Sequence, residues 1–125
     1  MVVTPTQRRI WLQRRQAAQA AAQAREQTAR HLAAQAAQRL RQRWPVEGVW
    51  LFGSVAEGRS HGSSDVDLAV AGLPPEALLT AKAELDGLAA HAVQSAREVI
   101  PIDLVPMESL PPHWQQRIRE RAIAL

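Results

Sequence analysis

The sequence predicts an α/β (α+β) domain in which a small mixed β-sheet is backed by helices and preceded by a long N-terminal helix. Two observations support this fold class. No helix breaker interrupts the chain between Pro5 and Pro45. After Pro45, short apolar runs of the length typical of buried strands alternate with turn signals and longer helical patterns. At 125 residues, the chain has the length of a single domain.

The N-terminal helix has a well-marked start. Thr4 is placed as the N-cap, Pro5 occupies the first helical position, and Gln7 can complete a capping box. The middle of the helix is almost entirely Ala, Gln and Arg, which favours helix but offers little apolar area to bury. We therefore divide the chain into a basic, Ala/Gln-rich helical extension, residues 1–27, and a folded domain, residues 28–125.

The elements after Pro45 follow from apolar runs and breakers. The expected order is a strand at 49–52, a Gly53-Ser54 turn, a helical turn at 55–58, a loop at 59–64, a strand at 66–70, a helix from 74 to about 97, a strand at 99–105, a helix at 112–121 and a short strand at 122–125. In the 74–97 helix, the side predicted to pack carries Leu78, Leu79, Leu85, Leu88, Ala89 and Ala92. Trp44 and Trp50 are interpreted as core, and Trp114 is expected to pack the last helix onto the sheet.

The charge is divided unevenly along the chain. Residues 1–45 carry nine arginines against one acid, whereas residues 46–125 carry six basic groups against eleven acids. The basic helix is able to contact nucleic acid or an acidic partner, or to associate with another chain, but we favour a solvated helix face. Arg117, Arg119 and Arg121 are interpreted as ordinary surface.

The composition bears on the compartment. There are no cysteines, which leaves neither disulfides nor thiolate metal sites and fits a reducing cytoplasm. No export signal is recognised at the N-terminus, and no segment approaches the roughly 20 apolar residues of a membrane helix. We therefore expect a cytoplasmic location and no membrane association.

The clearest sequence indication of a chemical function comes from two carboxylates, Asp65 and Asp67. Gly53 and Ser54 are followed, after ten positions, by Asp65 and Asp67. In a strand these two acids would project to the same side, where carboxylate oxygens can hold Mg²⁺ with a nucleotide's phosphates. We expect two Mg²⁺ ions there, held by Asp65 and Asp67.

The Gly53-Ser54 turn is a candidate anchor for the triphosphate. Glycine adds no side chain and adopts positive φ, so backbone N–H groups can approach phosphate, and Ser54 adds a hydroxyl donor. Ser64, directly before the acids, is assigned to the same role. The alternative interpretation is an ordinary turn followed by two solvated acids, but chance would produce this spaced pattern in a chain of this length at a rate on the order of one in a thousand.

Asp103 is the third candidate acid. It lies within Ile102-Asp103-Leu104-Val105, where a carboxylate is costly to bury unless a cation compensates it. We interpret Asp103 as a third metal ligand or as the base that takes the acceptor proton. The alternative is an acid that faces solvent on an edge strand.

The run LFGSVAEGRSHGSSDVDLAV, with IDLV and LPPHWQQRIRERAIAL downstream, resembles the minimal nucleotidyltransferase (MNT) family of the DNA polymerase beta-like superfamily. The resemblance covers roughly residues 30–125. It implies the nucleotidyltransferase fold, with Gly53 and Ser54 holding the triphosphate and Asp65, Asp67 and Asp103 binding Mg²⁺. Many such proteins resemble antitoxins that silence an all-helical HEPN-domain ribonuclease toxin by moving AMP from ATP onto a toxin tyrosine.

The sequence departs from the family pattern at one loop position. Where relatives commonly have Ala-Arg-Gly after the serine, this chain has Ala56-Glu57-Gly58, so the arginine that contacts phosphate is absent there. Arg59, at the next position, is a candidate substitute for nucleotide binding.

The resemblance implies a Mg²⁺-dependent transfer of AMP from ATP to a hydroxyl of a HEPN-type toxin, in a toxin–antitoxin pair. The short chain leaves little room for a separate acceptor-binding domain, which also favours a partner protein. Two alternatives remain open: an antitoxin that acts by docking alone, and transfer to a small molecule such as an aminoglycoside.

Overall fold

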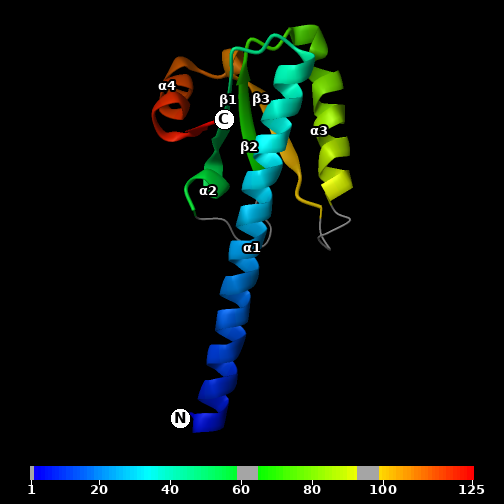
Figure 1. The fold of residues 1–125 in the computed structure, drawn as a ribbon. Coiled ribbons are helices and arrows are strands. Elements are labelled where there is room, and N and C mark those ends of the chain that lie inside the picture. The colour runs from blue at the N-terminus through cyan, green and yellow to red at the C-terminus, as the bar shows by residue number, and fades with distance from the viewer. Residues whose placement is uncertain (1, 59–64, 93–98) are drawn as a thin grey trace.

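The computed structural model describes residues 2–58, 65–92 and 99–125. Four strands and the helices around them make an α/β unit from which one long helix projects (Figure 1). This arrangement confirms the predicted fold class of a mixed sheet backed by helices with a long helix at the N-terminus.

Helix α1, Pro5–Arg43, begins and ends where the sequence predicts. The Thr4 hydroxyl accepts a hydrogen bond from the Gln7 N–H at 3.1 Å, and the Gln7 side chain accepts one from the Thr4 N–H at 3.0 Å. These two bonds form the predicted capping box and satisfy backbone donors that the first helical turn leaves unpaired. The helix ends at Trp44, directly before Pro45, because the residue preceding a proline disfavours helical backbone.

The sheet contains strands β1, Gly48–Phe52; β2, Val66–Ala71; β3, Ile102–Pro106; and β4, Ile123–Ala124. Their order across the sheet is β3-β2-β1-β4. Strand β1 pairs antiparallel with both β2 and β4, whereas β2 and β3 are parallel. The sheet is therefore mixed, and β3 is one of its edges.

Each face of the sheet carries a hydrophobic cluster. Helices α1 and α3, Leu78–Ala92, pack on the first face and enclose the main core, which includes Leu32, Leu51 and Leu68. Helix α4, Pro112–Arg121, lies on the other face, where Ile118 packs with Ala69 and Met107 in a smaller cluster. Figure 1 shows α1 and α4 on different sides of the strands.

Three short helices complete the chain described by the structure. Helix α2, Gly53–Ala56, follows β1 directly and corresponds to the predicted turn and helical turn. Two 3₁₀ turns, Pro75–Ala77 and Met107–Ser109, precede α3 and follow β3. The second of these turns was not predicted from the sequence.

Two predicted boundaries need comment. The third strand begins at Ile102, three residues later than expected, because Pro101 has no N–H with which to join a strand ladder. Helix α3 is described through Ala92, and its predicted end near residue 97 lies outside the described residues.

The prediction that Leu79 packs on the domain was wrong, since its side chain is 81% exposed. The buried residues of α3 are Ala81, Leu85 and Ala89, which recur every four positions. Leu79 precedes Ala81 by two residues, and two residues rotate by about 200° around an α-helix. It therefore points away from the core.

Two tryptophan predictions are also revised. Trp114 is 45% exposed, and the buried residue that packs α4 onto the sheet is Ile118. Trp50 is only partly buried and contacts the smaller cluster. Side chains along β1 alternate between the two faces of the sheet, and Val49 and Leu51 point into the main core, so Trp50 points to the other face. Trp44 is partly buried against the main core, as expected for a core-flanking residue.

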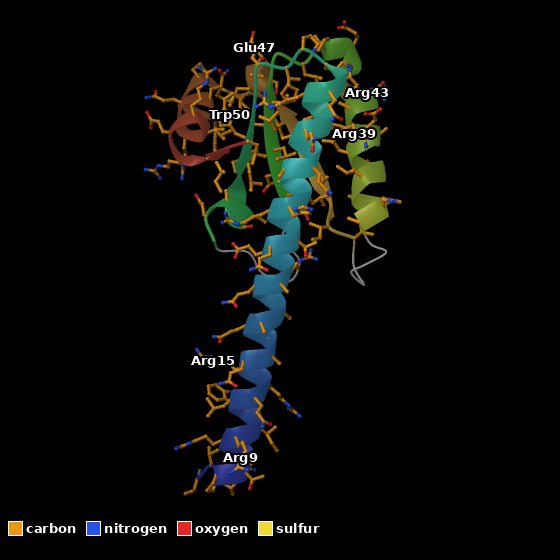
Figure 2. All side chains as sticks on the ribbon, viewed as in Figure 1. Arg9, Arg15, Arg39, Arg43, Glu47 and Trp50 are labelled. Carbon is orange, nitrogen blue, oxygen red and sulfur yellow. The ribbon has the colours of Figure 1, made fainter. Side chains whose placement is uncertain are left out.

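The first half of α1 extends away from the domain. Residues 2–21 are all exposed, and the first buried residue of the helix is Ala29. Arg9 and Arg15 lie on this projecting part, far from the sheet (Figure 2). This exposure fits the predicted extension, although the division at residue 27 stays a prediction. Among the described residues, no helix combines the length and the apolar character required to span a membrane.

Candidate functional site

Asp67 and Asp103 lie directly opposite each other on the parallel strands β2 and β3. Asp67 is also paired across the sheet with Phe52, the last residue of β1. Because strand side chains alternate, and Val66 and Leu68 point into the main core, Asp67 projects to the face that carries α4. Asp103 lies between Ile102 and Leu104, which are also in the main core, and so projects to that same face.

Asp65 joins this pair from the residue before β2. It is exposed and precedes the strand instead of lying within it. Its negative charge acts on Asp67, so the two acids are neighbours. The shared side of these acids stays a prediction, because only Asp67 belongs to the strand.

The three acids influence one another electrostatically. Partial burial raises the pKa of Asp67 above its ordinary value, and the negative charges of Asp103 and Asp65 raise it further. Burial disfavours an ionised carboxylate, and neighbouring like charges add to that cost. Asp67 is therefore the electrostatic centre of the group.

Asp103 is exposed, which contradicts the expectation of a carboxylate enclosed among apolar residues. It faces solvent because β3 is an edge strand and the apolar neighbours of Asp103 point to the opposite face. The alternative interpretation of the sequence, an acid that faces solvent on an edge strand, therefore describes the exposure of Asp103 correctly. Its register with Asp67 nevertheless places it in the acidic group.

Gly53 lies against Asp67 at the junction of β1 and α2. Its φ is +80°, a conformation that side chains other than glycine rarely adopt, and a Cβ at this position would collide with Asp67 Oδ2. The predicted requirement for glycine thus has two physical causes. Ser54, the next residue, is partly buried in the first turn of α2.

The position of α2 is fixed from the core side. Val55 is fully buried, and the Arg30 guanidinium of α1 donates hydrogen bonds to the carbonyl oxygens of Val55 at 3.1 Å and Ala56 at 3.5 Å. These bonds satisfy carbonyl groups at the end of a short helix, which lack partners within the helix itself. The packing of Val55 and the hydrogen bonds from Arg30 therefore hold the Gly53-Ser54 turn in position.

Two of the predicted nucleotide-binding residues cannot be placed. Arg59 and Ser64 lie outside the described residues. Among the residues that the structure describes, no three Asp, Glu, His or Cys side chains are positioned to hold a metal ion. The donor set itself, three carboxylates that interact by charge, has the hard oxygen chemistry that Mg²⁺ prefers.

A pocket that the sequence did not reveal opens beside Gly53. It has a volume of about 260 Å³ and lies between α2 and α4. Its walls include Phe52, Gly53 and Glu57 on one side and Trp114, Arg117 and Arg121 on the other. Arg117 and Arg121 were interpreted as ordinary surface; their separation by one helical turn, with Trp114 three residues before Arg117, was the sequence signal that they share a face.

Comparison with known proteins identifies the family. The sequence profile described as "nucleotidyltransferase domain" matches residues 33–125, which is well over half of the chain. The chain belongs to this family. It is a nucleotidyltransferase, and its mixed α/β fold is consistent with that class of enzyme.

Two solved structures are similar to this chain, and the first of them agrees with this assignment. A structure described as a minimal nucleotidyltransferase is 27% identical over 82% of this chain and 91% of that one, with a TM-score of 0.50. A structure described as a toxin-antitoxin with AMP-PNP is 25% identical over 79% of this chain and 70% of that one, with a TM-score of 0.47. Among curated proteins, none matches this chain.

Proposed function

We propose that this nucleotidyltransferase moves AMP from ATP onto a hydroxyl group of a partner protein, in a Mg²⁺-dependent reaction. The observation that carries the proposal is the contact between Gly53 and Asp67 together with the register of Asp67 and Asp103. This arrangement supports the proposal because the Gly53-Ser54 turn, the candidate anchor for phosphate, lies beside a group of carboxylates, and transfer of a nucleotidyl group needs both.

In the proposal, Asp65, Asp67 and Asp103 hold Mg²⁺. Partial burial raises the pKa of Asp67, and the negative charges of Asp103 and Asp65 raise it further, so a cation beside these acids would stabilise the ionised carboxylate. Asp65, Asp67 and Asp103 would hold Mg²⁺, which would offset their negative charge, stabilise charge on the phosphates and acidify the attacking hydroxyl. The carboxylates thus fit the metal by their hard oxygen chemistry.

The remaining groups bind and orient the substrate. Gly53 leaves room for the phosphates to approach the backbone, and Ser54 offers a hydroxyl donor. The acceptor oxygen attacks the α-phosphorus, a new P–O bond forms, and the bond to the β-phosphate oxygen breaks to release pyrophosphate. We assign Asp103 either to metal binding or to taking the acceptor proton. Its side chain is exposed, whereas that of its strand partner Asp67 is partly buried.

The acceptor is the finer part of the proposal. The match to the nucleotidyltransferase family covers residues 33–125. A partner protein that brings its own hydroxyl would supply the acceptor, and Asp65 and Asp103 are exposed to it. Following the family resemblance, we propose a tyrosine of a HEPN-type toxin as acceptor, which makes this chain the antitoxin of the pair.

The test is transfer of label from α-³²P-ATP in the presence of Mg²⁺, with and without the product of the neighbouring gene. We expect label on the partner with the wild-type protein. Asp65→Ala/Asp67→Ala should lower the rate at least about a hundredfold, since metal binding contributes several kcal/mol to transition-state stabilisation.

Asp86→Ala is the matched control, because Asp86 is an exposed acid on α3 and lies outside the acidic group. It should retain the wild-type rate. Tight complex formation without any label on the partner would overturn the proposal in favour of neutralisation by docking. Label on an aminoglycoside instead of the partner would move the acceptor to a small molecule.

A further inference from the structure

The pocket between α2 and α4 shares a wall with the acidic group. Gly53 lines the pocket and also lies against Asp67. A ligand that occupies the pocket therefore lies against Gly53, the residue that separates the pocket from Asp67. At about 260 Å³, the pocket is smaller than the roughly 300–1,000 Å³ of pockets that enclose drug-sized ligands, so it suits one part of a nucleotide better than the whole.

Helix α4 gives this pocket positive charge. Arg117 and Arg121 are four residues apart, so their side chains lie on the same helix face, and both line the pocket. The Arg117 guanidinium stacks over the Trp114 ring, 5.5 Å from its centroid, and this contact restricts where the arginine points. Arg119, between them in sequence, is exposed and does not line the pocket.

The pocket also contains the position at which this chain departs from its relatives. Glu57 stands on the α2 side of the pocket, where the family pattern has an arginine for phosphate. With glutamate instead of arginine at position 57, the α2 wall of the pocket has no cation at that position. The two arginines on the facing wall outnumber Glu57, so the pocket keeps a net positive charge. An arginine fork can bind two phosphate oxygens at once, which a wall of backbone groups alone does not replace.

We propose that Arg117 and Arg121 bind the β- and γ-phosphates of the nucleotide, and the pyrophosphate that leaves, in the pocket between α2 and α4. The inference rests on the proposed function for the direction of the nucleotide: the α-phosphate lies at the acids, and the two outer phosphates extend past Gly53 into the pocket. No bond is made or broken by the arginines themselves.

Binding of Mg²⁺-pyrophosphate to the full chain, measured by calorimetry, tests this directly. Arg117→Gln and Arg121→Gln should each weaken pyrophosphate binding about tenfold or more, because each removes a charge-assisted contact, and the double variant should lose it. Arg119→Gln is the matched control on the same helix and should bind as the wild type does. Thermal unfolding of each variant establishes that α4 remains folded.

Two further measurements separate phosphate binding from a structural effect. AMP lacks the outer phosphates, so its affinity should be unchanged in the double variant, while that of a non-hydrolysable ATP analogue falls. Adding Glu57→Arg to the double variant should restore pyrophosphate binding, because it returns a cation to the α2 wall.

The inference is overturned if the wild-type protein does not bind pyrophosphate, or if the folded double variant binds it as tightly as the wild type. Failure of the proposed function has a different signature. In that case no label reaches a partner from ATP, whereas the dependence of pyrophosphate binding on Arg117 and Arg121 is preserved.

Discussion

Asp67 connects all parts of the candidate site. It pairs with Phe52 on one side and with Asp103 on the other, and it lies against Gly53. Its carboxylate is partly buried next to two like charges, so the folded protein holds an ionised group in an unfavourable place. Groups held in this way are typical of functional sites, where a ligand supplies the missing compensation.

Replacing Asp67 by asparagine should therefore raise the melting temperature at pH 7 in a buffer that contains EDTA. A raised pKa means that the folded protein binds the Asp67 proton more tightly than the unfolded chain does. This contribution favours folding below the ordinary aspartate pKa and is lost as the pH rises through the raised folded value. The variant never carries the charge, so its advantage should shrink as the pH is lowered toward about 3.

Asp86→Asn serves as the control for the loss of one surface acid, because Asp86 is exposed on α3. Its melting temperature should stay close to that of the wild type at both pH values. An Asp67→Asn protein that melts below the wild type at pH 7 would contradict the electrostatic account of this site.

Gly53→Ala should destabilise the protein by about 1–3 kcal/mol, the usual cost of a strained backbone conformation for a residue with a Cβ. Two costs act together, since φ is +80° at this position and the new methyl group would collide with Asp67. Urea unfolding measures the change in the free energy of unfolding. Nucleotide transfer should fall as well, because the methyl group occupies the space between turn and acid.

Gly87→Ala is the matched control for the glycine substitution. Gly87 lies within α3, and a Cβ there would meet no atom within 4 Å. Alanine is the better helix former, so this variant should be more stable than the wild type by about 0.5–1 kcal/mol. Equal effects at the two glycines would show that the Gly53 turn carries no special constraint.

Helix α1 has two parts with different roles in stability. Residues 2–21 are exposed, whereas Ala29, Leu32, Ala33, Ala36, Ala37 and Leu40 are buried in the main core. Removing residues 1–21 should therefore change the free energy of unfolding by less than about 0.5 kcal/mol, the range of changes at exposed positions. Leu32→Ala should cost about 2–5 kcal/mol, because it empties space in a packed core.

These two variants are compared by urea unfolding at one protein concentration. A large loss of stability on truncation would mean that the exposed half of α1 is held by contacts between chains. In that case the loss should depend on protein concentration, since association stabilises the folded state by mass action.

The elements that the sequence predicted well have strong local signals. The capping box at Thr4, Pro45 after the helix and the apolar runs of the central strands each act through neighbouring residues. The exposure of Leu79 and Asp103 could not be predicted in the same way, because it depends on which helix face and which sheet edge remain uncovered.

The candidate site shows the same division. The relation of Gly53 to Asp65 and Asp67 could be predicted, because all three residues belong to one strand–turn–strand segment. The pocket required α4 to be placed beside α2, across sixty residues of chain, and no local pattern encodes that contact. Long-range packing therefore revealed Arg117 and Arg121 as candidate site residues.

The whole molecule combines a small domain with a helix that extends well beyond it. Helix α1 has 39 residues and is therefore roughly 58 Å long, whereas a globular chain of this size has a radius of gyration of about 14 Å. Small-angle X-ray scattering of the monomer should give a radius of gyration roughly 2 Å or more above that globular value, because the exposed half of α1 adds mass far from the centre. Removing residues 1–21 should bring it back to the globular value for the shorter chain. A full-length monomer that already scatters as a globular particle would mean that the extension folds back onto the domain in solution, and the four arginines within residues 2–21 (8, 9, 14 and 15) would then lie close to the acidic remainder of the chain instead of projecting from it.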